Sequence, residues 1–210
     1  MMRKLAILGA GSWGLTLAWL AANGNEDARI ALWSHRPEKA EALRRDRRVR
    51  FPLELELPAR VDVTGDLAEA VDGADVVVLV VTSKATREVA RRLAQSGALR
   101  PDAILVNASK GIELDTLKPL SQAVAEELPG QPFAVLSGPT LAKEILAGLP
   151  TACSIASSDA ATCEWLQTNL SRSRMFRLYS NADVRGVELG GALKNVIAIA
   201  SGFMTAKAYG

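Results

Sequence analysis

The residues of this sequence best suited to chemistry are two lysines and a run of glycines. The sharpest pattern surrounds Lys194, because Val187, Gly191, Lys194 and Ala198 recur at spacings of four, three and four residues. Residues at these spacings share one face of an α-helix, so the ammonium lies among small and apolar side chains. Such a lysine reaches solvent along the surface, pairs with an anion, or has its pKa lowered until it exchanges protons near neutral pH.

The adjacent glycines Gly190 and Gly191 lie in the same helical segment as Lys194. A glycine inside a helix costs about 1 kcal/mol relative to alanine. Its presence therefore usually marks close approach by another backbone or by a ligand. The pattern predicts a site for proton transfer at Lys194, and the alternative is a lysine that only extends to solvent.

A second feature is the G-x-G-x-x-G pattern of Gly9, Gly11 and Gly14, which follows an apolar run and opens a helix-like segment. In a dinucleotide-binding turn the first glycine permits the tight turn, the second lets a pyrophosphate approach, and the third lets the helix pack on the strand. The helix N-terminus adds free N–H groups and a positive dipole end. The pattern predicts dinucleotide binding, and the alternative is a structural turn without a ligand.

The end of the second predicted strand indicates which dinucleotide is bound. An Asp or Glu there would accept hydrogen bonds from a ribose 2′-hydroxyl, but the residues are Trp33, Ser34, His35 and Arg36. Arg36 could pair with a 2′-phosphate, and His35 could lie against the adenosine. We therefore expect the chain to accept NADP as well as NAD. The alternative is that Arg36 is a solvated loop residue.

Two further turns follow strand-like runs. The segment Asn107–Glu113 carries Lys110 in a polar turn, where an anionic or carbonyl oxygen could be held. The segment Ser137–Thr140 contains Gly138 and Pro139, which favour a tight turn into a helix. Ligands of open parallel sheets bind at the carboxyl ends of the strands, so both turns face the expected crevice. Each could equally be an ordinary connection between a strand and a helix.

The segments that must position these residues alternate between strand-like and helix-like patterns, which is typical of a parallel sheet. We expect an α/β fold, with a Rossmann-like, doubly wound, mostly parallel sheet of about eight strands in residues 1–182. The expected strands are 5–8, 29–33, 61–64, 75–81, 103–107, 133–136, 152–156 and 175–179, and the expected helices are 12–22, 37–45, 66–71, 85–95, 117–128, 141–147 and 159–170.

The pattern changes at Asp183. Residues 183–210 form one continuous helix-like segment with small and apolar residues nearly all round, as in a helix buried in an all-helical unit. We expect these residues to be the first helix of a C-terminal substrate domain that is truncated in this chain.

Composition limits the classes of function. The 25 basic and 23 acidic side chains leave a net charge of +2, too little to indicate binding to nucleic acid or to an anionic membrane surface. Two cysteines and one histidine provide neither a disulfide framework nor a zinc-ligand spacing. The longest apolar run, Val76–Val81, is far shorter than the ~20 residues that span a bilayer, and no signal-peptide pattern precedes it. We expect a cytoplasmic protein without an integral membrane segment or a bound metal.

Four runs of residues, in this order and spacing, resemble bacterial NAD(P)-dependent glycerol-3-phosphate dehydrogenase. They are Gly9–Gly14, Lys110–Gly111, Leu136–Glu144 and Gly186–Asn195. The resemblance covers essentially the whole chain. It implies an oxidoreductase that interconverts sn-glycerol 3-phosphate and dihydroxyacetone phosphate by hydride transfer, for glycerophospholipid synthesis. A homodimer is one assembly compatible with it.

The resemblance also implies roles for single residues. Lys194 would donate and accept the proton at the C2 oxygen of the substrate. Lys110 would contact both cofactor and substrate, and Gly138 and Thr140 would contact substrate. The remaining residues would contact the dinucleotide: Ser12, Trp13, His35, Arg36 and Ala142, beside Gly9, Gly11 and Gly14 of the turn.

The sequence departs from the family in two places. Members of the family continue through a helical domain that carries an arginine–asparagine pair for the substrate phosphate, and residues 1–210 contain no such domain. The stretch Arg48–Leu53 lacks the asparagine that usually precedes its aromatic residue. Two alternatives therefore stand beside the resemblance. One is a dinucleotide-binding module without catalysis, and the other is a related dehydrogenase such as ketopantoate reductase or 3-hydroxyacyl-CoA dehydrogenase.

Overall fold

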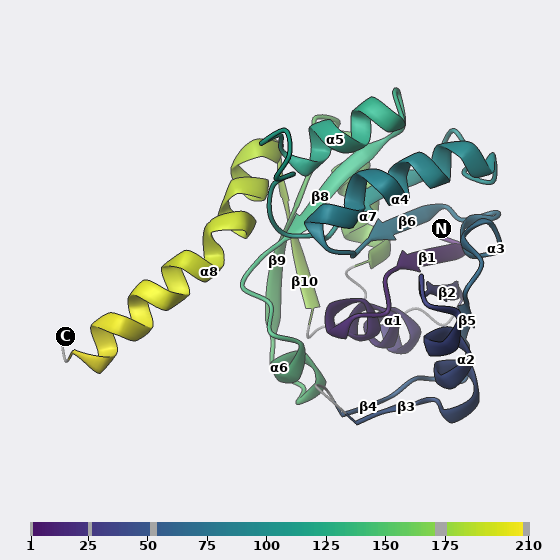
Figure 1. Ribbon diagram of the computed structural model, residues 1–210, viewed down its shortest axis with the longest axis horizontal. Helices are drawn as coiled ribbons and strands as arrows, with labels where there is room; N and C mark the ends of the chain where they lie inside the picture. The colour runs from purple at the N-terminus through teal and green to yellow at the C-terminus, as the bar shows by residue number, and fades with distance from the viewer. Residues whose placement is uncertain (1, 25–26, 51–53, 171–175, 208–210) are drawn as a thin grey trace.

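The computed structural model describes residues 2–24, 27–50, 54–170 and 176–207. Its main feature is an eight-stranded sheet with helices on both faces and one long helix that extends away from it (Figure 1). The strand order is β10-β9-β8-β7-β6-β1-β2-β5. The strands are β1 (Lys4–Leu8), β2 (Arg29–Trp33), β5 (Val61–Thr64), β6 (Val76–Leu79), β7 (Ile104–Asn107), β8 (Phe133–Ser137), β9 (Thr151–Ala156) and β10 (Phe176–Asn181), and a separate hairpin joins β3 (Arg48–Val49) to β4 (Leu55–Glu56).

Side-chain alternation in the central strand β1 assigns the helices to two faces. Leu5 and Ile7 join one buried cluster, and Ala6 and Leu8 join the other. The first cluster includes residues of α1 (Ser12–Gly24), α2 (Pro37–Asp46), α6 (Ala142–Leu146) and α7 (Ala160–Leu170). The second includes residues of α3 (Leu67–Val71), α4 (Ser83–Ser96) and α5 (Leu120–Glu127). A strand that is apolar on both sides, as β1 is, can be buried only between two helical layers.

The sheet changes direction once, between β8 and β9. Strand β8 is parallel to β7 but antiparallel to β9, and Ser137 at the end of β8 lies opposite Ser154. Because β10 is parallel to β9, it ends at the edge of the sheet where β8 begins. The chain must therefore travel back along the sheet to reach the edge where β1, β6, β7 and β8 end.

Helix α8 (Val184–Ala206) makes this return. The side chain of Asp183 caps its N-terminus by accepting a hydrogen bond from the Gly186 amide at 2.8 Å. From Val184 to Gly191 the helix rises about 10 Å, which is similar to the roughly 13 Å length of β8. A Cβ atom on Gly191 would lie 2.5 Å from the Ser137 Oγ, so the helix has reached the carboxyl end of β8 at this point.

The structure confirms the expected mostly parallel, doubly wound sheet, and most element boundaries agree within two residues. Helix α5 begins three residues later than expected, because Pro119 precedes its first turn and Leu117 has a positive φ of 57°. The hairpin of β3 and β4 was not predicted, since strands of two residues leave no periodic pattern. Met175, expected to start the last strand, lies outside the described residues.

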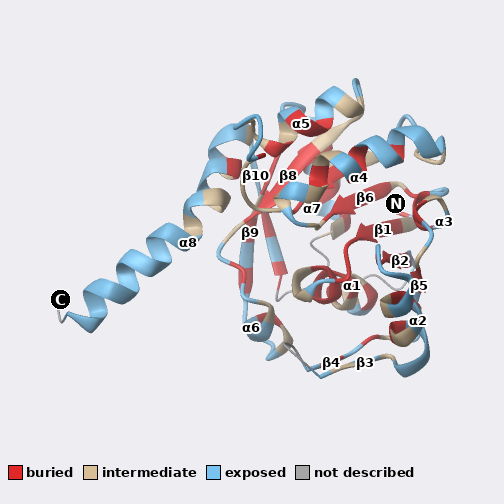
Figure 2. Cartoon of the chain, in the orientation of Figure 1, coloured by how far each residue is buried: buried red, intermediate tan, exposed pale blue. Residues whose placement is uncertain are grey.

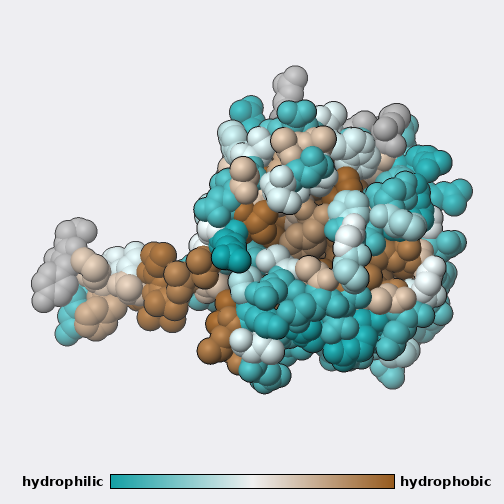
Figure 3. Space-filling view, turned by 90° about the horizontal axis from the view of Figure 1, so that it is seen from above, coloured by the Kyte–Doolittle hydropathy of each residue, from teal (hydrophilic) through white to brown (hydrophobic). Residues whose placement is uncertain are grey.

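Helix α8 differs from its expected surroundings. Among its described residues only Glu188 is buried, and most of the helix is exposed (Figure 2). Several exposed side chains are apolar, and they form a hydrophobic projection (Figure 3). By length and composition alone α8 could cross a membrane, which the search for uninterrupted apolar runs had missed. Core helices of soluble proteins share this length and composition.

The amino end of the chain is tied to a distant helix. The Met2 amide donates a buried hydrogen bond to Asn169 Oδ1 of α7 at 3.1 Å, and Met2 is 1% exposed. Two residues that are 167 positions apart in the sequence therefore meet next to the amino end of β1.

Candidate active site

The glycine turn between β1 and α1 is built as the sequence pattern predicts. Gly9 has a φ of 133°, which other residues rarely adopt, and a Cβ there would lie 2.4 Å from the Val80 carbonyl oxygen. A Cβ on Gly14 would lie 1.8 Å from the Gly9 carbonyl oxygen. A Cβ on Gly11 would meet nothing within 4 Å. Gly9 and Gly14 are thus required by packing, whereas Gly11 borders open space that suits a pyrophosphate.

Three residues that the sequence assigned to the dinucleotide lie next to this turn or on a helix that packs against α1. Trp13 is half-buried at the start of α1, and its ring centroid lies 6.5 Å from that of Phe176 in β10. Ala142 begins α6, which packs against α1, and it is half-buried. Ser12 is half-buried at the first position of α1. Ser12 and Trp13 thus adjoin the turn directly, whereas Ala142 lies on a neighbouring helix.

His35 and Arg36 follow β2 and are exposed at the same edge of the sheet. The His35 ring lies 6.4 Å from the buried ring of Trp33, measured between centroids. Lys39, which sequence reasoning missed, reaches from α2 to the glycine turn, where its Nζ donates to the Ala10 carbonyl oxygen at 2.6 Å. Burial lowers the pKa of Lys39, and the charge of Arg36 lowers it further.

Lys110 lies at the centre of the second group of predicted residues. Its Nζ donates to the Gly138 carbonyl oxygen at 3.1 Å and to Thr140 Oγ1 at 3.5 Å. The turns after β7 and β8 thus meet, as expected for neighbouring parallel strands. The pKa of Lys110 is lowered to about 8, mainly by burial and next by the nearby charge of Lys194.

Lys194 lies beside Lys110 on the first half of α8 and is half-buried. It lines a cavity of ≈ 480 Å³ between α8 and strands β8, β9 and β10, which contribute Ser137, Ser154 and Asn181. Gly191 allows this arrangement, because any Cβ would press on Ser137. Gly190 also lines the cavity, but a Cβ atom added there would meet no atom within 4 Å. Of the two adjacent glycines, the predicted close approach therefore holds for Gly191 only.

The lysine of this site whose pKa is lowered to about 8 is Lys110, which the sequence placed only in a polar turn. The burial of Lys110 comes from separate segments, and a pattern within one helix could not reveal it. Ser137 and Cys153 were also missed. Burial raises the pKa of the Cys153 thiol to about 12, which keeps it neutral beside Lys110.

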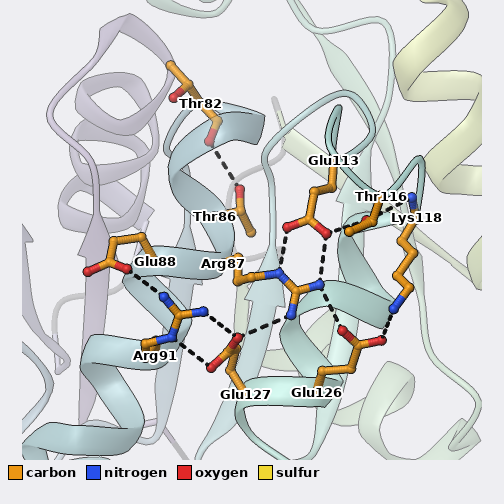
Figure 4. Close-up of polar contacts among 10 residues, drawn as sticks. All are labelled: Thr82, Thr86, Arg87, Glu88, Arg91, Glu113, Thr116, Lys118, Glu126 and Glu127. Carbon is orange, nitrogen blue, oxygen red and sulfur yellow. Dashed lines mark hydrogen bonds and ion pairs between the residues drawn. The ribbon is translucent and has the colours of Figure 1, made fainter.

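A network of ion pairs holds the loop that follows Lys110 (Figure 4). Glu113 is buried and accepts from Arg87 of α4 through both carboxylate oxygens, at 2.6 and 2.8 Å. Arg87 also contacts Glu126 and Glu127 of α5. These contacts lower the pKa of Glu113 to about 2 and raise that of Arg87 above its usual value. The loop is therefore fixed to two helices at the position three residues beyond Lys110.

Two larger cavities lie away from Lys110 and Lys194. One of ≈ 1030 Å³ is lined by residues at the amino ends of β1 and β2, including Lys4 and Arg29. Another, of ≈ 650 Å³, lies between α5, the start of α8 and the turn after β9. Ligands of open α/β sheets bind at the carboxyl ends of the strands. The cavity that Lys194 lines adjoins that edge at Ser137 and Gly138.

The sequence matches two profiles of one family. Residues 4–163 match the profile described as NAD-dependent glycerol-3-phosphate dehydrogenase N-terminus, and residues 183–210 match its C-terminus. The chain belongs to the NAD-dependent glycerol-3-phosphate dehydrogenase family. The matched ranges include the glycine turn at Gly9–Gly14 and the part of the chain that forms α8 with Lys194.

Curated relatives and solved structures agree with this membership. Glycerol-3-phosphate dehydrogenase (NAD(P)+) of Geobacter sulfurreducens is 45% identical over 96% of this chain, and that of Lysinibacillus sphaericus is 41% identical over 100%. The crystal structure of glycerol-3-phosphate dehydrogenase from Coxiella burnetii matches 99% of this chain with a TM-score of 0.85 and 34% identity. The chain spans about 60% of the length of these proteins, namely 60%, 62% and 62%.

Proposed function

We propose that this chain acts in the NAD(P)-dependent interconversion of dihydroxyacetone phosphate and sn-glycerol 3-phosphate, a step that feeds glycerophospholipid synthesis. The observation that carries the proposal is that Lys110 contacts Gly138, Thr140 and Lys194, beside a cavity that Gly138 and Lys194 line. The four residues come from three separate segments of the chain. The family match and the named relatives support the same reaction.

The residues fit a dinucleotide at the glycine turn. Gly9, Gly11, Ser12, Trp13 and Gly14 would hold the pyrophosphate side, with Ala142 across the turn and His35 and Arg36 near the adenosine. The bound nicotinamide supplies the hydride for the substrate carbonyl. Either NAD or NADP suits these residues, and the family match supports both.

The chain's own residues would handle the substrate and the proton. Lys110 is mostly protonated at pH 7, given its pKa of about 8, so its ammonium can hold a substrate oxygen together with Gly138 and Thr140. Lys194 would deliver the proton to the C2 oxygen as the alkoxide develops, and would take it back in the reverse direction. General acid catalysis of this kind typically contributes about 10² to 10⁴ in rate.

Several wider features belong to the same proposal. Residues 1–182 would form the dinucleotide-binding domain, and residues 183–210 the start of a helical substrate domain. Helix α8 would pack against protein rather than lipid, because it carries Glu188 and Lys194 toward the sheet domain. We further propose a cytoplasmic location and a homodimeric assembly, and the bacterial relatives support the first of these.

Titration of the purified chain with NADPH, followed by dihydroxyacetone phosphate, tests the function. Nicotinamide fluorescence reports binding and absorbance reports oxidation. We expect saturable binding, then oxidation that Lys194→Ala abolishes while binding is retained. The matched control is Lys207→Ala, an exposed lysine at the end of α8.

Full oxidation in Lys194→Ala would refute the proton-transfer role. Binding without oxidation in the unaltered chain would refute its catalytic competence and favour a dinucleotide-binding module. Absence of binding would refute the dinucleotide site itself.

A further inference from the structure

Two cations lie close together where β2 meets α2, beside the glycine turn. Arg36 precedes α2 and is exposed, and Lys39 lies in the first turn of the same helix. Within residues 2–24, 27–50, 54–170 and 176–207, neither side chain forms an ion pair. The pKa of Lys39 is lowered, mainly because the ammonium is partly buried and next because the charge of Arg36 repels it. Two like charges without a counterion are better accommodated once an anion lies between them.

The position of Lys39 is fixed by its contact with the glycine turn. Its Nζ uses one donor on the Ala10 carbonyl oxygen at 2.6 Å. An ammonium carries three donors, so two remain for a ligand. The buried Ser34 shapes the approach of Arg36, since its Oγ donates to the Arg36 carbonyl oxygen at 3.2 Å and accepts from the Arg36 amide at 3.3 Å. The backbone of Arg36 is thereby fixed at the end of β2, and its charge lies near enough to Lys39 to lower the pKa of that lysine.

A dinucleotide on this turn would bring its adenosine ribose to the end of β2. The pyrophosphate lies at the start of the first helix, and the residue that reads the ribose 2′ position lies about 20 residues further on. Residues 33–36 occupy that place and include no carboxylate. Lys39 spans from α2 to the turn, so its ammonium lies between the ribose-reading position and the pyrophosphate-binding turn.

We propose that Lys39 and Arg36 together form a two-cation clamp for the 2′-phosphate of NADP, and that Lys39 is the residue that makes the chain prefer NADP to NAD. This inference rests on the proposed dinucleotide site. A dianionic phosphate would accept from the guanidinium and from the free donors of the ammonium. NAD presents only a 2′-hydroxyl there, which leaves the two cations without a counterion.

The test uses the adenosine half of the cofactor, so that it does not depend on turnover. Adenosine 2′,5′-bisphosphate and adenosine 5′-monophosphate are titrated by calorimetry into the whole chain, and NADPH and NADH by fluorescence. We expect the bisphosphate to bind at least about tenfold more tightly than the monophosphate. Lys39→Met should reduce this ratio by about tenfold with monophosphate affinity little changed, and Lys39→Arg should preserve most of it.

The matched control is Arg45→Gln, which removes an exposed charge paired with Asp46 on the same helix. It should leave the ratio unchanged. Equal binding of the two nucleotides by the unaltered chain would overturn the proposal. So would an equal loss of both in Lys39→Met, because Lys39 would then serve only to hold the turn. If no nucleotide binds to the unaltered chain, the dinucleotide site fails instead. If Lys39→Met does not fold, the proposal is tested with Arg36→Gln. An unchanged ratio of bisphosphate affinity to monophosphate affinity in Arg36→Gln would then overturn the clamp.

Discussion

At the scale of single residues, Lys110 joins three segments, because its ammonium contacts Gly138 and Thr140 and lies near the charge of Lys194. The helical spacing around Lys194 and the adjacent glycines predicted an unusual lysine on α8. Its neighbour Lys110 could not be ranked above any other turn lysine, because its burial depends on Gly138 and Thr140, 28 and 30 positions away. Lys39 was not predicted for the same reason, since its hydrogen-bond partner is the Ala10 carbonyl oxygen, 29 positions away.

The charge of Lys194 contributes to the low pKa of Lys110, and this can be measured directly. Lys194→Met should raise the pKa of Lys110 above about 8 but keep it below 10.5, because burial is the larger cause. NMR titration of the chain with ¹³C-methylated lysines follows the Lys110 signal. Lys207→Met should leave the midpoint in place. An unmoved midpoint in Lys194→Met would show that the two ammonium groups do not interact.

The adjacent glycines of α8 should respond oppositely to alanine. Gly191→Ala should destabilise the fold by up to about 1 kcal/mol, since its Cβ would displace the hydroxyl of the buried Ser137 and this cost exceeds the helix-forming gain of alanine. Gly190→Ala should stabilise it by about 0.5 to 1 kcal/mol, because alanine favours the helix and nothing lies within 4 Å. Urea unfolding measures both. Equal effects of the two substitutions would contradict the close approach at Gly191.

At the scale of elements, periodicity located the strands and helices, but it carries no information on strand direction. The antiparallel pairing of β8 and β9 explains why Lys194 lies well inside α8 rather than at its start. A helix that begins at the amino end of β8 must rise along the whole strand before it reaches Lys110. The spacing between Asp183 and Lys194 is thus a consequence of topology.

The ion pair of Arg87 and Glu113 should make stability sensitive to acid. The folded-state pKa of Glu113, about 2, is below the ordinary 4.5, so the stabilisation is present above pH 4.5 and is lost as the pH falls toward 2. Its size is on the order of 2 kcal/mol. Arg87→Met should flatten this part of the pH–stability curve, measured by urea unfolding, whereas Arg45→Gln should not. A curve unchanged by Arg87→Met would refute the contribution.

Helix α8 is held to α5 by one buried carboxylate. Glu188 accepts from the Ser121 amide at 2.8 Å and from its hydroxyl, and burial raises the pKa of Glu188. Ser121→Ala removes one donor and should speed hydrogen exchange of residues 184–194 severalfold, because the remaining carboxylate contact is weaker. Ser201→Ala, at an exposed position on α8, is the control. Unchanged exchange in Ser121→Ala would exclude the tether.

At the scale of the whole molecule, the fold class and the alternation of layers were predictable because each buried strand is apolar and each helix has turn signals at its ends. The surroundings of α8 were not. Its sequence predicts a buried helix, yet beyond Lys194 its described residues lie exposed (Figure 2). A pattern of apolar residues indicates that a helix is suited to burial, but it does not identify the surface that buries the helix.

The backbone amides in the exposed half of α8 should exchange hydrogen faster than those in its first half. Residues 195–206 lack buried neighbours, so their amides should lose protection well before those of 184–194, as measured by hydrogen exchange with mass spectrometry. Uniform protection along α8 in the isolated chain would contradict this and would indicate that the exposed half is covered in solution.

The hydrogen bond between Met2 and Asn169 has a consequence for the order of folding. Strands β1, β2, β5 and β6 all lie within the first 79 residues and can pair as soon as these are synthesised. The amide of Met2 gains its acceptor only after residue 169 has emerged. Contacts this distant form slowly, because the long intervening loop must close first. Strand β1 is therefore completed by a helix that is synthesised well after it, and the amino end of the sheet closes late.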